Sequence, residues 1–228
     1  MIGGMFDSVS IASVVDKLAE IDRNPRQLFF YIPLDADVIK QLEGIRNGVT
    51  LPEGSDAQDF DHVTLLYIPK SETDIEQSKV DDIVRDARDV VDGHRAISAR
   101  IQGWAYFDGA EKDGEKKTAL VALIDAPGLE DLHVDLKSLM RRQGHPEAGT
   151  HGFTPHVTFA YLPQGARVES LPTISLSFDI DKARLANGDV HDLPLAPKLS
   201  SVKAASSMKG MTLGEAAAWL AERRSSSK

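Results

Sequence analysis

Short stretches in which apolar, β-branched and aromatic residues dominate predict strands, and alternate residues of a strand face opposite sides of its sheet. These stretches are residues 28–33, 62–69, 95–107, 117–125 and 156–163. Helices are predicted over residues 35–46, over residues 73–93, where a capping box from Thr73 to Glu76 precedes an apolar stripe, and over residues 129–142. A last pair of strands is predicted over residues 174–181 and 183–194, with Asn187-Gly188 in the turn. This mixture of elements predicts an α+β domain over residues 26–195.

The two ends of the chain have a different pattern. Apolar residues at helical spacing predict an N-terminal helix within residues 1–25. Beyond Pro197 the composition shifts to Ser, Lys and Ala, and a capping box from Thr212 to Glu215 opens a short apolar stripe. Residues 196–228 are therefore predicted to be a linker and a short C-terminal helix, which offers a surface for a protein partner or for self-association.

One strand pattern occurs twice. Residues 62–69 read HVTLLYIP and residues 156–163 read HVTFAYLP, with His, Val, Thr, Tyr and Pro in register. In each copy His and Thr share one face of the strand, about 6.6 Å apart along the backbone. Simple alternation places Tyr67 and Tyr161 on the opposite, core face. Buried polar groups without partners cost a few kcal/mol, so polar residues at matched positions indicate a functional site.

This His-x-Thr pair resembles the signature of the 2H phosphoesterase superfamily. The superfamily includes bacterial 2′-5′ RNA ligases, 2′,3′-cyclic nucleotide phosphodiesterases and related phage enzymes that degrade cyclic-oligonucleotide immune signals. The resemblance implies a bilobal, pseudo-symmetric fold, in which two antiparallel sheets line a central groove with helices outside. Each lobe would supply one His-x-Thr strand and a packed helix.

Two imidazoles suit the cleavage of a phosphodiester, which needs one base and one acid near neutral pH. Threonine hydroxyls can donate to the nonbridging oxygens, where negative charge is concentrated. We therefore expect His62, Thr64, His156 and Thr158 to be catalytic. The pattern does not indicate which histidine is the base.

Aromatic side chains beside the motifs are candidates for base stacking. Tyr31 on the first strand and Trp104 and Tyr106 on the central hairpin are expected to bind substrate. Arg95 and Arg100 are interpreted as residues of a solvated strand face, and His133 as a surface or capping residue.

Composition narrows the possible ligands. The formal net charge of −9 argues against tracking a long polyanion and favours a small nucleotide or short oligonucleotide. The chain contains no cysteine, and no signal peptide or membrane span is apparent, so a cytoplasmic location is expected. His151 raises the alternative of a zinc site, but each strand face offers one imidazole, so we expect neither metal nor cofactor.

The sequence thus predicts a metal-independent phosphodiesterase of small nucleotides. Its substrate would be a 2′-5′ linked oligonucleotide, a 2′,3′-cyclic phosphate or a cyclic oligonucleotide signal, and the reverse RNA ligase reaction ranks below hydrolysis. The alternative is a non-catalytic module that binds a nucleotide or RNA end and docks to a partner through its C-terminal helix.

Overall fold

The computed structural model describes residues 28–68, 77–112, 114–145 and 152–198. The chain divides into two compact units, residues 1–196 and 197–228. The helices predicted near the two ends lie outside the described residues. Among the described helices, none is long and apolar enough to cross a membrane.

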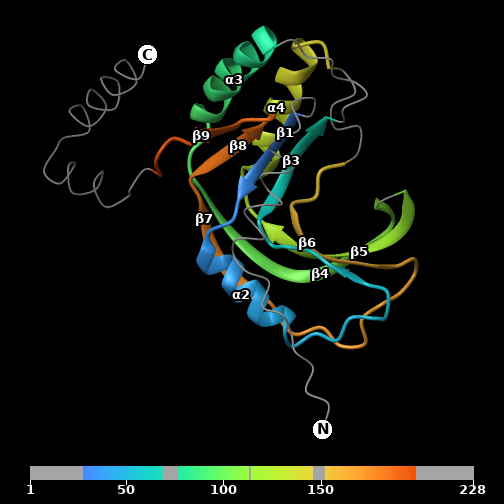
Figure 1. Ribbon diagram of the computed structural model, residues 1–228. Helices are drawn as coiled ribbons and strands as arrows, with labels where there is room; N and C mark the ends of the chain where they lie inside the picture. Colours follow the sequence, from blue (N-terminus) through green and yellow to red (C-terminus); the bar gives the residue numbers. More distant parts are fainter. Residues whose placement is uncertain (1–27, 69–76, 113, 146–151, 199–228) are drawn as a thin grey trace, which may run out of the picture. The chain divides into compact units, whose positions relative to one another are not determined.

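Two antiparallel sheets form the framework (Figure 1). Sheet A has four strands, in the order β3 (His62–Ile68), β1 (Leu28–Pro33), β8 (Lys182–Ala186) and β9 (Val190–Pro194). Sheet B has five strands, in the order β2 (Asp56–Ala57), β6 (His156–Pro163), β5 (Glu115–Asp125), β4 (Ile97–Lys112) and β7 (Ser175–Ile180). Each sheet contains one His-x-Thr strand, and the predicted pair of antiparallel sheets is confirmed.

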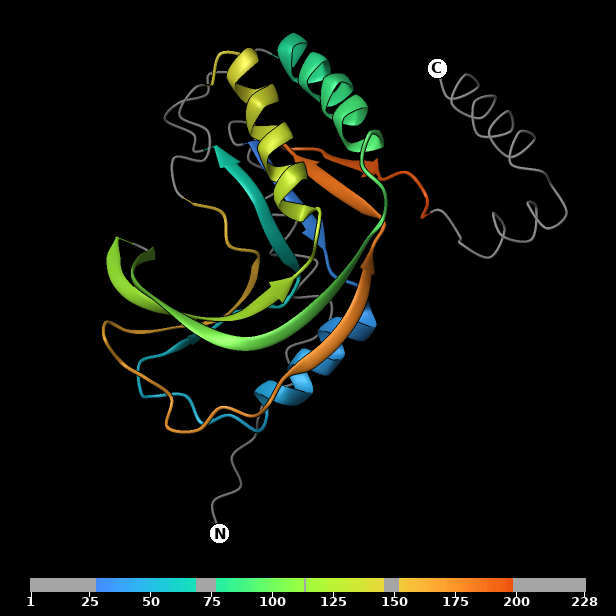
Figure 2. The ribbon, with the colours of Figure 1, turned by 180° about the vertical axis from the view of Figure 1, so that it is seen from behind.

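Three helices are described: α2 (Ala36–Arg46), α3 (Gln77–Asp92) and α4 (Leu129–Arg142). Figures 1 and 2 show α3 and α4 side by side over sheet A, where α4 packs on β3 and α3 on β8 and β9. The short α2 lies near sheet B, and its last residue, Arg46, lies over the ring of Phe60, which contacts Phe159 of β6. One packed helix per lobe was predicted, but both long helices cover sheet A.

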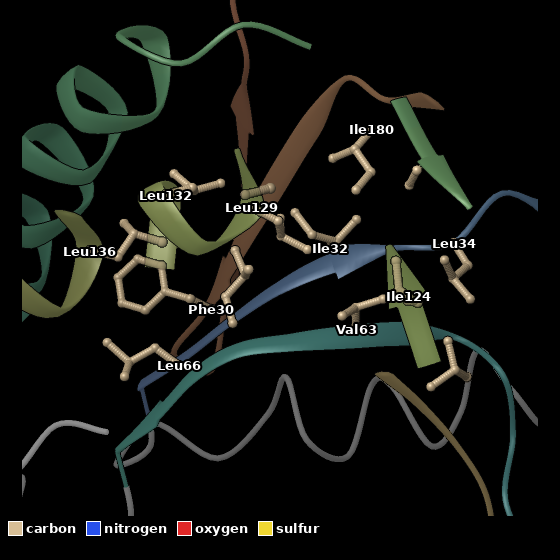
Figure 3. Close-up of a cluster of buried hydrophobic side chains, with 14 of the residues drawn as sticks. Phe30, Ile32, Leu34, Val63, Leu66, Ile124, Leu129, Leu132, Leu136 and Ile180 are labelled. Atoms are coloured by element: carbon tan, nitrogen blue, oxygen red, sulfur yellow. The ribbon is translucent and has the colours of Figure 1, made fainter. Parts of the chain in front are cut away.

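A single hydrophobic core joins the two sheets. Figure 3 shows side chains of β1 and β3 packed with side chains of β5, β7 and α4; the labelled residues of this cluster are Phe30, Ile32, Leu34, Val63, Leu66, Ile124, Leu129, Leu132, Leu136 and Ile180. Burying one such aliphatic or aromatic side chain stabilises the fold by roughly 1.5–3 kcal/mol. This shared core fixes the edge strand β3 of sheet A against β6 of sheet B, and the two strands are in contact.

The C-terminal strand pair differs from the prediction. One pair was expected over residues 174–181 and 183–194, but three strands form, and they belong to two sheets. β7 pairs with β4 in sheet B, and after Asp181 the chain enters sheet A as the β8–β9 hairpin. Gly188 in the hairpin turn has φ 77°, a conformation that favours glycine. Alternation predicts strands, but it does not identify the sheet that each strand joins.

Candidate active site

Both motifs contain a β-bulge at the same position. In β3, Phe30 pairs with Leu66 and Tyr31 with Thr64, so Leu65 is skipped. In β6, Leu120 pairs with Ala160 and Val121 with Thr158, so Phe159 is skipped. A bulge places two consecutive side chains on one face and shifts the alternation of the residues that follow.

The bulges bring a tyrosine of each motif to the histidine side. Leu65 and Leu66 are both buried, and so are Phe159 and Ala160. Tyr67 is therefore on the face of His62, with 45% of its surface exposed, instead of in the core where the sequence predicted it. Tyr161 follows the second bulge in the same way and pairs with Ala119, two residues from the partner of Thr158.

The site face of sheet A is aromatic. We use this name for the face that carries His62, Thr64 and Tyr67. Phe29 and Tyr31 project from β1 on this face and stack with their ring centroids 4.9 Å apart. The His62 ring is edge-on to both, at 5.0 Å from Phe29 and 5.7 Å from Tyr31. Tyr31 thus lies beside the histidine as predicted, but it is only 1% exposed, so it supports His62 rather than presenting a ring to a ligand.

The site face of sheet B, which carries His156, Thr158 and Tyr161, has smaller neighbours. Across β5 these residues are paired with Leu123, Val121 and Ala119. Phe107 on β4 contacts His156 edge-on, with the centroids 5.1 Å apart. The sequence analysis did not single out Phe107, although its position one residue beyond Tyr106 places it on the opposite face from that tyrosine.

Trp104 and Tyr106 are not on the histidine face. They pair with Ala122 and Leu120, which belong to the core. Trp104 contacts the buried Phe159 and donates through Nε1 to the Pro172 carbonyl at 2.7 Å. The Tyr106 hydroxyl accepts a hydrogen bond from the backbone N–H of Val168 at 3.1 Å. Both residues hold the segment between β6 and β7 against the core side of sheet B, so the structure does not bring them to the histidines.

The two histidines are supported differently. Nδ1 of His62 lies 2.6 Å from Oδ1 of Asp61, a side chain that is 10% exposed. Nδ1 of His156 donates to the backbone carbonyl of Thr154 at 2.7 Å. A carbonyl can only accept, so Nδ1 of His156 carries a proton and Nε2 is the basic nitrogen of the neutral ring.

The two imidazoles are close enough to interact electrostatically. Burial lowers the pKa of His156 below its usual value, and the positive charge of His62 lowers this pKa further, while the Thr154 carbonyl raises it. The strands that carry the two motifs, β3 and β6, are in contact, so the structure brings the two motifs together.

Arg184 extends the site face of sheet A, and the sequence analysis did not consider it. It pairs with Tyr31, which pairs with Thr64, so the three residues form one row across β8, β1 and β3. Burial opposes the charge of Arg184, but the hydrogen bond that it donates to Asp192 and the charge of that carboxylate help to keep its pKa above the usual range. Two cationic residues, Lys182 and Arg184, in an otherwise apolar strand that reads KARLA were the signal in the sequence.

His133 of α4 is buried, contrary to its interpretation as a surface residue. Its Nδ1 donates to the carbonyl of Leu65, the skipped residue of the first bulge, at 2.7 Å. Its ring stacks on Phe153, three residues before His156, with the centroids 4.3 Å apart. Its position four residues after Leu129 places it on the apolar stripe of the helix, a signal that could have been read from the sequence.

An open pocket of about 490 Å³ lies over Arg100, Asp125 and Ser177 and includes neither motif. Among the described residues, no group of three His, Asp or Glu side chains is arranged to hold a metal ion. His151, the candidate zinc ligand, lies outside the described residues.

Comparisons with known proteins agree with this architecture. The model of the 2′-5′ RNA ligase superfamily matches residues 37–192. The crystal structure of TT0787 from Thermus thermophilus has a TM-score of 0.55 and 19% identity, over 70% of this chain and 86% of that one. LigT from E. coli, complexed with 3′-AMP, has a TM-score of 0.54 and 19% identity, over 75% of this chain and 95% of that one. No curated protein matches.

The structural likenesses show the fold, and the family match covers well over half of the chain. The predicted resemblance of the chain to the 2H phosphoesterases is confirmed, and the matched residues include both His-x-Thr strands. The protein belongs to the 2′-5′ RNA ligase superfamily.

Proposed function

We propose that the protein is a metal-independent phosphodiesterase of small nucleotides, with His62, Thr64, His156 and Thr158 as its catalytic residues. Membership of the superfamily supports an enzyme of the phosphoesterase or ligase type. The observation that carries the proposal is the pair of imidazoles on matched faces of β3 and β6, two strands that are in contact although they belong to different sheets. That arrangement suits a base and an acid on opposite sides of one phosphate.

The local environments support different roles for the two histidines. His156 is partly buried, which favours its neutral form, and Nδ1 donates to a carbonyl, so Nε2 accepts a proton from the attacking water or ribose hydroxyl. Nδ1 of His62 contacts the Asp61 carboxylate, which orients the ring, and His62 donates a proton to the leaving oxygen. The new P–O bond forms as the scissile P–O bond breaks, and one proton enters His156 while one leaves His62.

The threonines complete the site. Thr64 and Thr158 lie two residues after the histidines on the same strand faces, and both are partly exposed. Their hydroxyls donate to the nonbridging oxygens, which stabilises the charge of the transition state.

The substrate we propose is a 2′-5′ linked oligonucleotide, a 2′,3′-cyclic phosphate or a cyclic oligonucleotide signal. Small nucleotides occupy LigT, which has been crystallised with 3′-AMP and with NADP+. The net charge of −9 further supports a short ligand over a long polyanion. A docking role for the C-terminal segment, with a protein partner or a second copy, and a cytoplasmic location remain proposals from the sequence.

The test is product formation in the presence of EDTA. 2′-5′ linked diadenylate, 2′,3′-cyclic AMP, a cyclic dinucleotide, a cyclic trinucleotide and polymeric RNA are compared at one salt concentration. We expect turnover of one or more of the small substrates in preference to the polymer. Loss of turnover with EDTA and its recovery with zinc would contradict the metal-independent reaction, and binding without product would favour the non-catalytic module.

A further inference from the structure

Tyr67 has an exposed aromatic ring on the site face of sheet A. It is 45% exposed, one of few large apolar side chains exposed in the described part of the chain. Its ring is edge-on to Phe29, with the centroids 6.1 Å apart, and Phe29 in turn contacts His62 at 5.0 Å. Phe29 is buried, so Tyr67 is the end of this aromatic cluster that solvent can reach.

Tyr161 is the matching ring of the other sheet. It follows the second bulge at the same spacing from its histidine, and it is partly exposed. The ammonium group of Lys112 lies 5.7 Å from its ring centroid. A cation at this position suits a ligand that carries phosphates.

Both tyrosines depend on the bulges for their position. Without the extra residue, each ring would turn to the core, as the alternation of the sequence predicted. The first bulge is held by His133 at the Leu65 carbonyl, and the second by the backbone N–H of Gln58 at the Phe159 carbonyl, 3.0 Å away. The same bulge in the two strands is thus held by two different contacts. Bulges often occur beside active sites, where they direct a side chain toward the site.

We propose that Tyr67 and Tyr161 are nucleobase platforms, one on each side of the scissile phosphate. Three residues of strand separate Thr64 from Tyr67, a rise of roughly 10 Å before the shortening at the bulge. This distance suits a base linked through its sugar to a phosphate held at the threonine. A substrate with a nucleoside on each side of the phosphodiester would use both platforms, whereas a 2′,3′-cyclic mononucleotide would use one. The inference rests on the proposed function and narrows its substrate to dinucleotide or longer phosphodiesters.

The test compares Tyr67→Ala and Tyr161→Ala on 2′-5′ linked diadenylate and on 2′,3′-cyclic AMP. Each variant should raise KM for the dinucleotide roughly tenfold, within the range of one lost base-stacking contact, with a smaller change in kcat. Only one of the two variants should raise KM for the cyclic mononucleotide. Tyr67→Phe and Tyr161→Phe keep the rings and should restore the lower KM.

Trp104→Phe and Tyr106→Phe are the matched controls, because these aromatic residues lie on the core side of sheet B. They should leave KM for both substrates unchanged. An unchanged KM for the dinucleotide in either alanine variant would overturn the two-platform proposal.

Failure of this proposal is distinguishable from failure of the proposed function. If the wild-type protein turns over neither substrate, the dissociation constant of diadenylate is measured for the same variants. A roughly tenfold weaker binding in both alanine variants would then support the platforms, although the phosphodiesterase proposal would have failed. Unchanged binding in either variant would overturn the platforms.

Discussion

The two lobes carry the same motif but hold it by different means. In sheet A, the supports are side chains: Asp61 contacts His62, and His133 donates to the carbonyl at the bulge. In sheet B, the supports are backbone groups: the Thr154 carbonyl holds His156, and the Gln58 N–H holds the second bulge. The two copies of the motif therefore carry the same residues on the site face, but the contacts that hold those residues in place differ between the two sheets.

The neighbouring strands differ in the same way. Tyr31 and Arg184 follow Thr64 across sheet A, whereas Val121 and Ala105 follow Thr158 across sheet B. In these two rows, sheet A offers an aromatic ring and a cation, whereas sheet B offers small aliphatic side chains, and Phe107 is the aromatic neighbour of His156.

The largest expected effect on activity comes from replacing the histidine that each lobe contributes. His62→Ala and His156→Ala should each lower kcat/KM by about a hundredfold or more, because each removes one proton-transfer group. Since the two act in one cycle, the double variant should be little slower than either single variant. Steady-state kinetics measures both effects, and near-normal activity in either single variant would remove that histidine from the mechanism.

The next prediction separates the two kinds of support. Asp61→Asn should lower kcat by about tenfold, since it replaces the carboxylate that orients the His62 ring with a weaker acceptor, and a tenfold change corresponds to about 1.4 kcal/mol. Thr154→Ala should leave kcat nearly unchanged, because His156 is held by the backbone carbonyl and the Thr154 side chain is exposed.

Glu53→Gln is a control for charge, because Glu53 is an exposed carboxylate of the segment that joins α2 to β3. It should retain full activity. An equal decrease in kcat in the Asp61 and Thr154 variants would contradict the proposed difference, in which a side chain holds His62 and a backbone carbonyl holds His156.

A smaller effect is expected on stability. His133→Leu should lower the free energy of unfolding by roughly 1–3 kcal/mol, because the Leu65 carbonyl loses its donor in a buried setting. Gln58→Ala should cost much less, since its backbone N–H remains to hold the second bulge. Urea unfolding of the two variants measures the contrast, and equal stabilities would contradict the assignment of the bulge supports.

The smallest prediction concerns pH and stability. Burial lowers the pKa of both His133 and His156 in the folded protein; at His133 the nearby Lys137 lowers it further, while the Leu65 carbonyl and Glu130 raise it. At pH values between these lowered pKa values and the ordinary value of about 6.5, the unfolded chain therefore binds more protons than the folded protein does. Stability should be fully present above that value and should decrease as pH falls below it. His133→Leu should make the free energy of unfolding depend less on pH. An unchanged slope of this free energy against pH would contradict the role of His133.

Much of the fold follows from the sequence because the patterns are local. The repeat of HVTLLYIP as HVTFAYLP identified both site strands, and helical spacing identified α2 and α4. The placement of β7 in one sheet and of β8 and β9 in the other depends on long-range pairing, which alternation does not encode.

The errors at the site have one main physical cause. Strict alternation placed Tyr67 in the core, because the bulge that turns it outward is fixed by a contact from α4 rather than by the strand itself. The two consecutive apolar residues in each motif, Leu65-Leu66 and Phe159-Ala160, were the available signal. Trp104 and Tyr106 were chosen for their type and their strand, but their cross-strand partners assign them to the core face.

The pH dependence of kcat/KM in the presence of EDTA tests the central claim most directly. His156 must be neutral to act as the base, and its pKa lies below the usual value, so the acid limb of the profile should lie below about pH 6.5. The rate should fall again at higher pH, when the acid loses its proton. His156→Ala should abolish the acid limb together with most of the activity. A profile without an acid limb below about pH 6.5, or one that requires added zinc, would contradict the assignment of His156 as base in a metal-independent reaction.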